Sequence, residues 1–340
     1  MFGYNMSDYD LRIYEEELAE FLPSKMIDCH THIWKEEFDK KVGTRGCVSW
    51  TSMVAKDNTI EDLLQTYKDM FPGKTVKPVL LGEPQCDLDK TNVYTAHASK
   101  DYNLPALYCT DWSMSAEFLE EEVEKGGFLG LKPYLNNSPK YIPNKEIRIF
   151  DFLTKEHLEI ANKKGWIVML HISRPGRLND PLNIAQLLEI EEKYPNVKLI
   201  VAHIGRAYTP EDLGNAFDIL KNTKNMKFDF TANTYDVAMM KCIEAVGPKR
   251  LMFGSDLPIV KMKMFRTFKN GIYYNNVPKG MYGDVSGDIH MVETDKKEIT
   301  CFMYEELLAF KRAAKELKLT KENINDILCN NAAELFNIEI

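Results

Sequence analysis

The chain has 340 residues, of which 44% are hydrophobic and 28% are charged, and its formal net charge at pH 7 is -8. This composition is typical of a soluble globular protein that can bury a large core without a disulfide or a structural metal. Acidic and basic residues are interspersed, which argues against a basic surface for nucleic acid or for an anionic membrane.

Other features of the sequence bound its cellular context. It contains no run of about 18 apolar residues, so no transmembrane helix is expected. The N-terminus lacks a basic start followed by an apolar stretch, which argues against a secretory signal. The seven cysteines are scattered and form no CxxC pair. We therefore expect reduced thiols and a cytoplasmic protein.

The order of the predicted elements indicates the fold. A helix capped by Ser7 is expected over residues 8–21, within an N-terminal helical extension of residues 1–24. Eight short apolar runs then alternate with amphipathic helical stretches, which predicts parallel strands joined by right-handed crossovers. The runs cover residues 25–33, 76–84, 104–112, 126–135, 166–172, 197–205, 227–233 and 250–258.

Eight such strands are the number that closes a (β/α)8 TIM barrel, and we predict this α/β fold as one domain over residues 1–340. An open doubly wound sheet is the competing fold, but no glycine-rich phosphate motif follows the first strand. Two connections are too long for simple turns, residues 34–60 and 259–300. The second is rich in Gly, Tyr and Asn and is expected to be a long, lid-like loop.

Polar side chains recur where the predicted strands end. In a TIM barrel these C-terminal strand ends meet at the face that carries the active site. The period of two in a strand places His30 and His32 on one face. The other residues at strand ends are Lys132, His171, His203 and Asp256.

These strand ends predict a metal site. A single buried histidine is more often satisfied by a backbone carbonyl than bound to a metal, and HxH alone is a weak motif. Here, however, four of the seven histidines lie at three strand ends and an aspartate lies at a fourth. Imidazole and carboxylate are ligands that a zinc-like divalent ion accepts, whereas packing needs alone rarely gather so many polar groups.

Several motifs resemble a known family. "DCHTH" at residues 28–32, "LH" at 170–171, "AHIGR" at 202–206 and "FGSDLP" at 253–258 are similar to the amidohydrolase superfamily, specifically to its amidohydrolase-related (type 2) branch. The terminal "ILCNNAAELFNI" at 327–338 also resembles the closing helix of that branch. The resemblance covers nearly the whole chain.

The resemblance implies roles for individual residues. His30, His32 and His171 would be metal ligands, with Asp256 as the fourth ligand and as the general base for water. His203 would be either a ligand of a second metal or, with one metal, an acid/base and substrate-polarising group. We expect a divalent ion, Zn or alternatively Mn, and one ion rather than two.

Lys132 has three interpretations. Two-metal members resembling this arrangement use a carbamylated lysine on the fourth strand as a bridge between the metals. In one-metal members the ammonium group could pair with a substrate anion, and this substrate-binding role is the one we favour. The simplest alternative is a lysine that neutralises a nearby carboxylate.

Other cations lie close to the strand ends and suggest the charge of the substrate. They are Arg174, Arg177, Arg206 and Lys261, and we expect the three arginines to bind substrate. Surface salt bridges are the simpler explanation for each one alone. Several cations at one barrel mouth in an acidic chain would favour a small anionic substrate, because Arg binds carboxylates bidentately.

Aromatic residues could cover the same site. Tyr273, Tyr274 and His290 lie in the long 259–300 segment, although for each a structural role is the better single interpretation. Tyr134 and Trp34 lie near strand ends and could line an aromatic pocket.

The leading functional hypothesis is a metal-dependent hydrolase that activates water against an ester, lactone or amide carbonyl. The alternative is a non-oxidative decarboxylase or other lyase acting on a small carboxylic acid with the same metal site. A non-catalytic scaffold is disfavoured because ligands and proton-transfer groups are both present. The N-terminal helix could cap its own barrel or a neighbour's in a homo-oligomer.

Overall fold

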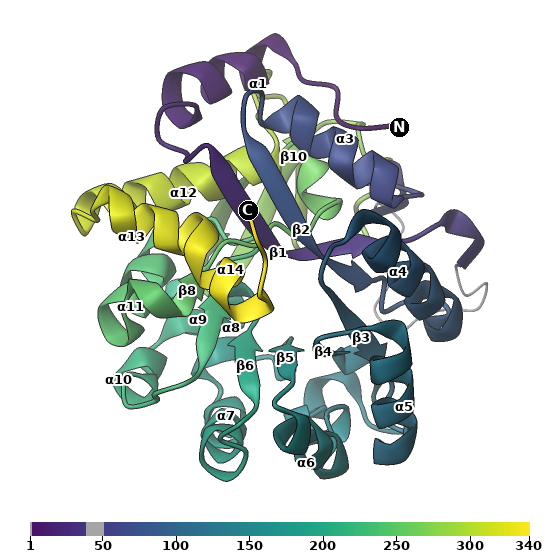
Figure 1. Cartoon of the computed structure of the whole chain (residues 1–340). Coiled ribbons are helices and arrows are strands. Elements are labelled where there is room, and N and C mark those ends of the chain that lie inside the picture. The colour runs from purple at the N-terminus through teal and green to yellow at the C-terminus, as the bar shows by residue number, and fades with distance from the viewer. Residues whose placement is uncertain (1, 39–50) are drawn as a thin grey trace.

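The computed structural model describes residues 2–38 and 51–340 and confirms the predicted TIM barrel. Eight parallel strands form one sheet in chain order, with helices around its outside (Figure 1). The strands are β1 (Lys25–Ile33), β2 (Thr75–Gly82), β3 (Ala106–Thr110), β4 (Gly130–Pro133), β5 (Ile167–Leu170), β6 (Lys198–Val201), β7 (Lys227–Asp229) and β8 (Leu251–Met252).

The first and last strands are joined by backbone hydrogen bonds that continue beyond β8. The N–H of Cys29 donates to the carbonyl of Phe253 at 3.0 Å, and that of His32 donates to Leu257 at 2.9 Å. In the other direction the N–H of Asp256 donates to the carbonyl of His30 at 2.8 Å. The segment that carries Asp256 is therefore fixed beside the segment that carries the two histidines.

Several helices begin at side-chain caps, and the cap expected at Ser7 is confirmed. Ser7, Asp87, Ser115 and Thr154 each accept a hydrogen bond from a backbone N–H in the first helical turn, which satisfies a donor that the helix itself leaves free. The helices are α1 (Asp8–Ile13), α2 (Thr51–Val54), α3 (Ile60–Met70), α4 (Leu88–Tyr102), α5 (Ala116–Gly126), α6 (Lys155–Lys164), α7 (Pro181–Lys193), α8 (His203–Arg206), α9 (Pro210–Leu213), α10 (Ala216–Leu220), α11 (Asp236–Val246), α12 (Phe302–Glu316), α13 (Lys321–Asn325) and α14 (Asn331–Phe336).

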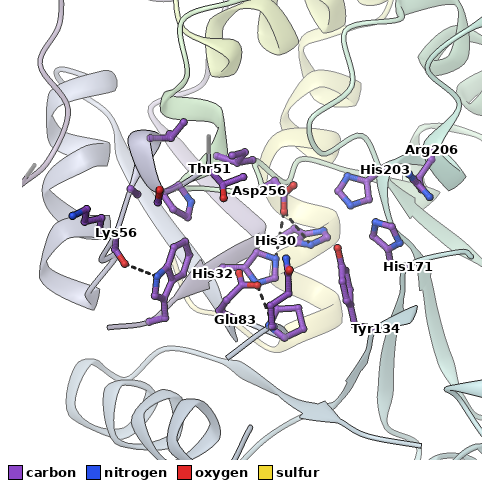
Figure 2. A pocket seen from close by; sticks show the side chains of 18 of the residues that line it. His30, His32, Thr51, Lys56, Glu83, Tyr134, His171, His203, Arg206 and Asp256 are labelled. Atoms are coloured by element: carbon purple, nitrogen blue, oxygen red, sulfur yellow. Dashed lines mark hydrogen bonds and ion pairs between the residues drawn. The ribbon is translucent and has the colours of Figure 1, made fainter. Parts of the chain in front are cut away.

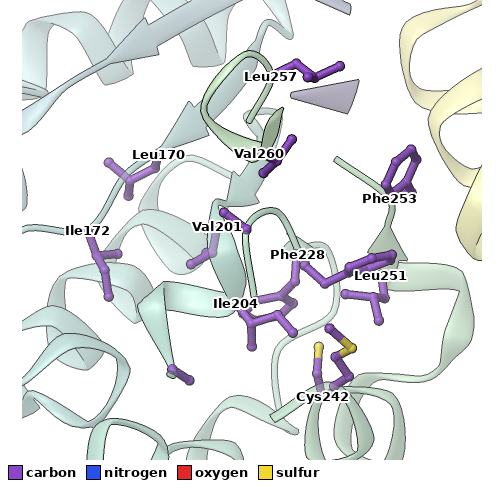
Figure 3. Close-up of a cluster of buried hydrophobic side chains, with 14 of the residues drawn as sticks. Leu170, Ile172, Val201, Ile204, Phe228, Cys242, Leu251, Phe253, Leu257 and Val260 are labelled. Atoms are coloured by element: carbon purple, nitrogen blue, oxygen red, sulfur yellow. The ribbon is translucent and has the colours of Figure 1, made fainter. Parts of the chain in front are cut away.

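The strands divide the core into two layers. Alternate residues of β5 show the division: Ile167 and Met169 pack inside the barrel, while Val168 and Leu170 pack outward against the helices. The inner layer is closed by the C-terminal segment, where Phe336 packs against it. Figure 3 shows part of the outer layer, where side chains from strands β5–β8 pack against the surrounding helices. Because both faces of the sheet are covered, the strands read as continuous apolar runs.

The 259–300 segment differs from the long loop expected. It contains β9 (Phe265–Lys269), β10 (Ile272–Pro278) and β11 (Met291–Thr294), which form a separate three-stranded sheet in the order β11-β10-β9. Asn270 and Gly271 connect β9 to β10 with φ angles of 52° and 73°. An Asn-Gly turn of this kind is the preferred two-residue link between antiparallel strands.

The N-terminal extension packs against the base of this inserted segment. The Asp10 carboxylate is buried, pairs with Lys263 and accepts hydrogen bonds from Ser7 and Thr300. Of the long connection expected over residues 34–60, positions 39–50 lie outside the described residues. Among the helices that are described, none combines the length and the apolar character needed to cross a membrane.

Candidate metal centre and active site

The four strand-end histidines lie together at the mouth of the barrel, as predicted. The ring centroids of His30 and His32 are 5.4 Å apart, and those of His30 and His203 are 5.0 Å apart. The ring centroids of His171 and His203 are also 5.0 Å apart. Figure 2 shows His203, His171, Arg206 and Tyr134 on one side of Asp256.

All four imidazoles share one hydrogen-bonding pattern. The Nδ1 atom of His32 contacts the carbonyl of Gly82 at 2.9 Å, that of His171 contacts Ile172 O at 3.2 Å, and that of His203 contacts Thr231 O at 2.9 Å. Nδ1 of His30 contacts the Asp229 carboxylate at 3.2 Å. Each partner can only accept a hydrogen bond, so Nδ1 carries the proton and Nε2 of the neutral ring is left as an electron-pair donor.

Burial keeps three of these rings neutral. Burial, and then the charge of Lys132, lower the pKa of His30 to about 3. Burial likewise lowers the pKa of His203, and burial with the charge of Arg206 lowers the pKa of His171. Burial also acts to lower the pKa of His32, but its hydrogen bond to Asp256 and the charge of that carboxylate outweigh this and raise it.

Asp256 lies within reach of both first-strand histidines. Its Oδ1 atom is 3.3 Å from Nε2 of His32 and 3.7 Å from Nε2 of His30. Burial would raise the pKa of this carboxyl group, yet the hydrogen bond from His32 and the charge of that ring hold it well below its ordinary value. Asp256 is therefore ionised and available as a ligand or proton acceptor.

The donor atoms suit a divalent metal ion. One ligand atom from each of His30, His203 and Asp256 lies within 4.8 Å of the others. Neutral imidazoles that carry their proton on Nδ1, together with an ionised carboxylate, are the donor set that zinc accepts. His203, expected mainly as an acid/base group, thus belongs to the compact donor group. The ligand roles of His32 and His171 remain predictions.

Lys132 lies beneath this cluster and does not line the cavity. It is fully buried, and its Nζ atom is 2.9 Å from Nε2 of His30. Burial lowers the pKa of its ammonium group. A contact with a ligand atom at the centre fits a role in the metal site itself more directly than a contact with substrate.

The cluster opens into a cavity of about 650 Å³. Its walls combine the polar centre with aromatic side chains from distant parts of the chain, and they include Trp34, Tyr134, Tyr208 and Tyr273. Tyr274 and His290 do not line it, but the His290 ring stacks on Tyr273 at 4.0 Å. A cavity of this size suits a small molecule.

The predicted substrate-binding arginines are placed differently from one another. Arg206 lines the cavity, and its guanidinium forms no hydrogen bond or ion pair with residues 2–38 or 51–340. Arg174 pairs with Asp180 and Glu146. Arg177 pairs with Asp212 at 2.8 Å, and Lys261 pairs with Asp62 at 2.8 Å. Of these four predicted cations, Arg206 alone combines a charge that is unpaired within the described part of the chain with a place in the cavity wall.

Backbone strain gathers at the same strand ends. His203, Arg206, Ala232 and Asp256 have positive φ angles of 58°, 60°, 49° and 71°. Non-glycine residues adopt this left-handed region at an energetic cost, and such residues cluster at functional sites. The strain is concentrated where the candidate ligands leave their strands.

A model of the amidohydrolase family matches residues 27–338. The chain belongs to this family. The predicted amidohydrolase-related (type 2) branch is confirmed, and the chain is a metal-dependent enzyme of amidohydrolase type. No curated protein matches it in sequence.

Solved structures share the fold of this amidohydrolase. An amidohydrolase from Burkholderia multivorans with bound zinc has a TM-score of 0.60 and 12% identity, over 92% of this chain and 99% of that one. A probable 2-pyrone-4,6-dicarboxylic acid hydrolase from Acinetobacter baumannii with citric acid bound has a TM-score of 0.59 and 16% identity, over 92% and 99%. A dihydroxybenzoic acid decarboxylase from Polaromonas with bound manganese and 2-nitroresorcinol has a TM-score of 0.56 and 13% identity, over 93% and 97%.

Sequence reasoning missed three residues of the amidohydrolase site. Asp229 ends β7 and accepts hydrogen bonds from His30 Nδ1 and from the backbone N–H of His203 and Thr231. Its signal was a carboxylate inside the apolar run "KFDF". Glu83, just beyond β2, and Tyr208, beyond β6, both line the cavity, but neither stands out in sequence.

Proposed function

We propose that this amidohydrolase is a hydrolase that directs water to an ester, lactone or amide carbonyl of a small anionic substrate. The observation that carries the proposal is the place of Asp256: an ionised carboxylate beside His32 and His30, facing a cavity that also holds the unpaired Arg206. A proton acceptor and an anion-binding group thus face one enclosed space.

The metal would be held by His30, His32, His171 and Asp256, and we propose one zinc or manganese ion. When bound, it would polarise a substrate carbonyl and make water more acidic. His203 lies close to the same centre and could serve as a fifth ligand if the ion were bound by more than four atoms.

The protein's own groups complete the reaction. The guanidinium of Arg206 binds a substrate carboxylate and so orients the molecule in the cavity. Asp256 Oδ1 accepts the proton of the attacking water. That proton then passes to the leaving group, either directly or through Nε2 of His203, which can accept it because Nδ1 is already held by Thr231 O. The aromatic walls exclude bulk water, which strengthens these electrostatic interactions.

A non-oxidative decarboxylase is the second candidate, and the aromatic lining favours it. Trp34, Tyr134, Tyr208 and Tyr273 surround the cavity, and flat aromatic acids would pack against such walls. In that reaction Asp256 or His203 would deliver a proton to the carbon that loses carboxylate. The ligand set would be unchanged.

The test compares both chemistries in one preparation. Metal atoms per chain are counted in the purified protein, which is then assayed against a panel of lactones, esters and amides and a panel of aromatic carboxylic acids. Asp256→Asn should keep the metal but reduce turnover by about 100-fold or more, because the proton acceptor is lost.

Hydrolysis with one metal per chain is the expected result. Carbon dioxide release without any hydrolysis would replace the hydrolase by the decarboxylase. Near-normal turnover in Asp256→Asn would rule out its role as the base.

A further inference from the structure

Arg266, at the second position of β9, lies where four separate parts of the chain meet. Its Nη1 atom donates to the carbonyl of Ala232 at 2.9 Å, and its Nε atom donates to Oδ1 of Asn275 at 2.9 Å. Its Cζ atom lies 4.7 Å from the ring centroid of Phe302. No carboxylate in the described parts of the chain forms an ion pair with it. A partly buried guanidinium without such a partner is costly, so its other contacts must hold it.

The first of these contacts leads to the metal centre. Ala232 has a φ of 49°, a strained conformation for a residue with a side chain. The residue before it, Thr231, supplies the carbonyl that fixes Nδ1 of His203 at 2.9 Å. The hydrogen bond from Arg266 thus holds the turn whose neighbouring carbonyl orients His203.

The second set of contacts leads to the cavity wall. The Arg266 Cζ atom lies 4.7 Å from the Tyr208 ring centroid and 4.6 Å from that of Tyr273. The two rings meet edge to face at 5.1 Å, and both line the cavity. Arg177 lies near the same rings, at 5.1 and 4.9 Å, but its charge is neutralised by Asp212. A cation near an aromatic face is attracted by the ring, more strongly when water is excluded.

We propose that Arg266 is a positioning residue that couples the inserted β9–β11 segment to His203. One end of its guanidinium fixes the Thr231–Ala232 turn, and its face holds Tyr208 and Tyr273 in the cavity wall. The segment beyond β8 therefore sets the orientation of a group at the metal centre that it does not touch. This coupling is independent of which reaction the enzyme performs.

The chemistry of the contacts requires arginine. The planar fork donates to Ala232 and Asn275 at once while its face packs on aromatic rings. A lysine at this position keeps the charge but has a single nitrogen, which cannot reach both acceptors. Methionine keeps much of the length and removes both the charge and the donors.

The experiment follows the imidazole protons by NMR in the full-length, [15N]histidine-labelled chain supplemented with Zn2+. The Nδ1–H signal of His203 is assigned by its loss in His203→Gln. Arg266→Met is compared with the native protein and with Arg312→Met, a matched change at an exposed arginine that pairs with Asp236. Exchange of the Nδ1 proton with solvent is measured in each.

Arg266→Met should shift the His203 signal and speed its proton exchange about tenfold, the loss expected for one hydrogen bond from a charged donor. Arg312→Met should leave both unchanged. A native His203 signal and exchange rate in Arg266→Met would overturn the proposal. If Arg266→Met does not fold, Arg266→Lys decides in the same way: a faster exchange supports the coupling and an unchanged one overturns it.

Neither result depends on turnover, so it is separate from the outcome for the proposed hydrolase. The exchange rates stand even if every substrate panel fails.

Discussion

The two sides of the cavity are built differently. On the histidine side, His30 and His32 lie in β1, and His171 and His203 lie within two residues of the ends of β5 and β6. Every Nδ1 atom of these four rings contacts an oxygen that can only accept a hydrogen bond. On the tyrosine side, Tyr208 and Tyr273 come from a connecting loop and from an inserted sheet. They are held by each other and by two arginines instead of by the barrel.

The difference suggests that the histidine side performs the chemical step and the tyrosine side determines which substrate is accepted. Strand ends are fixed by the backbone ladder of the barrel, so the metal-binding groups have little freedom to vary in position. The tyrosine side depends on side-chain packing of an insertion, which can change in sequence without altering the barrel. We therefore expect changes on the histidine side to abolish metal binding or turnover, and changes on the tyrosine side to alter which substrate is accepted.

The largest effect is expected from removing the first-strand ligands. His30→Ala combined with His32→Ala should strip the metal and reduce turnover to background, while the barrel stays folded because its core is intact. Elemental analysis and circular dichroism check both points. Unchanged metal content in the folded double variant would contradict the ligand assignment.

A smaller loss, of metal affinity, is expected from changing Asp229, which contacts the candidate ligands from behind. Asp229 accepts hydrogen bonds from three donors, and Asn has only one acceptor oxygen for them. Asp229→Asn should therefore weaken metal affinity by about 10- to 100-fold. A competition titration with a chelator measures this, with Asp236→Asn, at a partly exposed carboxylate paired with Arg312, as a control. Equal affinities in the two variants would show that Asp229 does not orient the centre.

Arg206 in the cavity wall should affect binding of substrate more than the chemical step. Arg206→Met removes an unpaired guanidinium and should raise KM for an anionic substrate about tenfold, with a smaller change in kcat. Arg174→Met is the control, because Arg174 is engaged by Asp180 and Glu146 outside the cavity. Steady-state kinetics measure KM and kcat for both variants. An equal rise in KM for Arg206→Met and Arg174→Met would show that Arg206 has no special role in substrate binding.

The smallest effect is expected from Glu306 of α12, which lies behind the two sides of the cavity. Its carboxyl group is fully buried, and burial holds its pKa well above the ordinary value. Above the pKa of about 4.3 in the unfolded chain, the folded protein keeps a proton that the unfolded chain has lost. The free energy of unfolding should therefore fall as pH rises, by up to about 1.4 kcal/mol per pH unit from this group.

Glu306→Gln resembles the protonated side chain and should remove that contribution. Urea unfolding between pH 5 and pH 8 would then show the variant gaining stability relative to the native protein as pH increases. Parallel curves for the two proteins would show that Glu306 is ionised in the folded state.

The barrel and its histidines could be predicted because each depends on local pattern. The apolar runs around Ile27, Val168 and Ile200 mark strands covered on both faces, and their polar ends mark the active face. The hairpin of β9 and β10 was missed although Asn270-Gly271 is a strong turn signal, since the flanking strands are only partly buried and lack a continuous apolar run.

The partners of the predicted residues could not be foreseen in the same way. Arg177 is paired because the fold brings Asp212 next to it, whereas no carboxylate in the described part of the chain pairs with Arg206. No pattern in the sequence predicts which arginine lies close to a carboxylate. Arg266 shows the same limit, because only the tertiary structure brings its contacts Tyr208, Ala232 and Phe302 together.

The hydrogen bond between Asp256 N–H and His30 O has a consequence for how the protein is made. These residues are 226 positions apart, and an encounter over such a separation is slow relative to local contacts. A ribosome must release the chain beyond Asp256 before the donor group can assemble. Until then the first-strand histidines have no carboxylate from the last strand, so truncated products should be unable to form the complete centre.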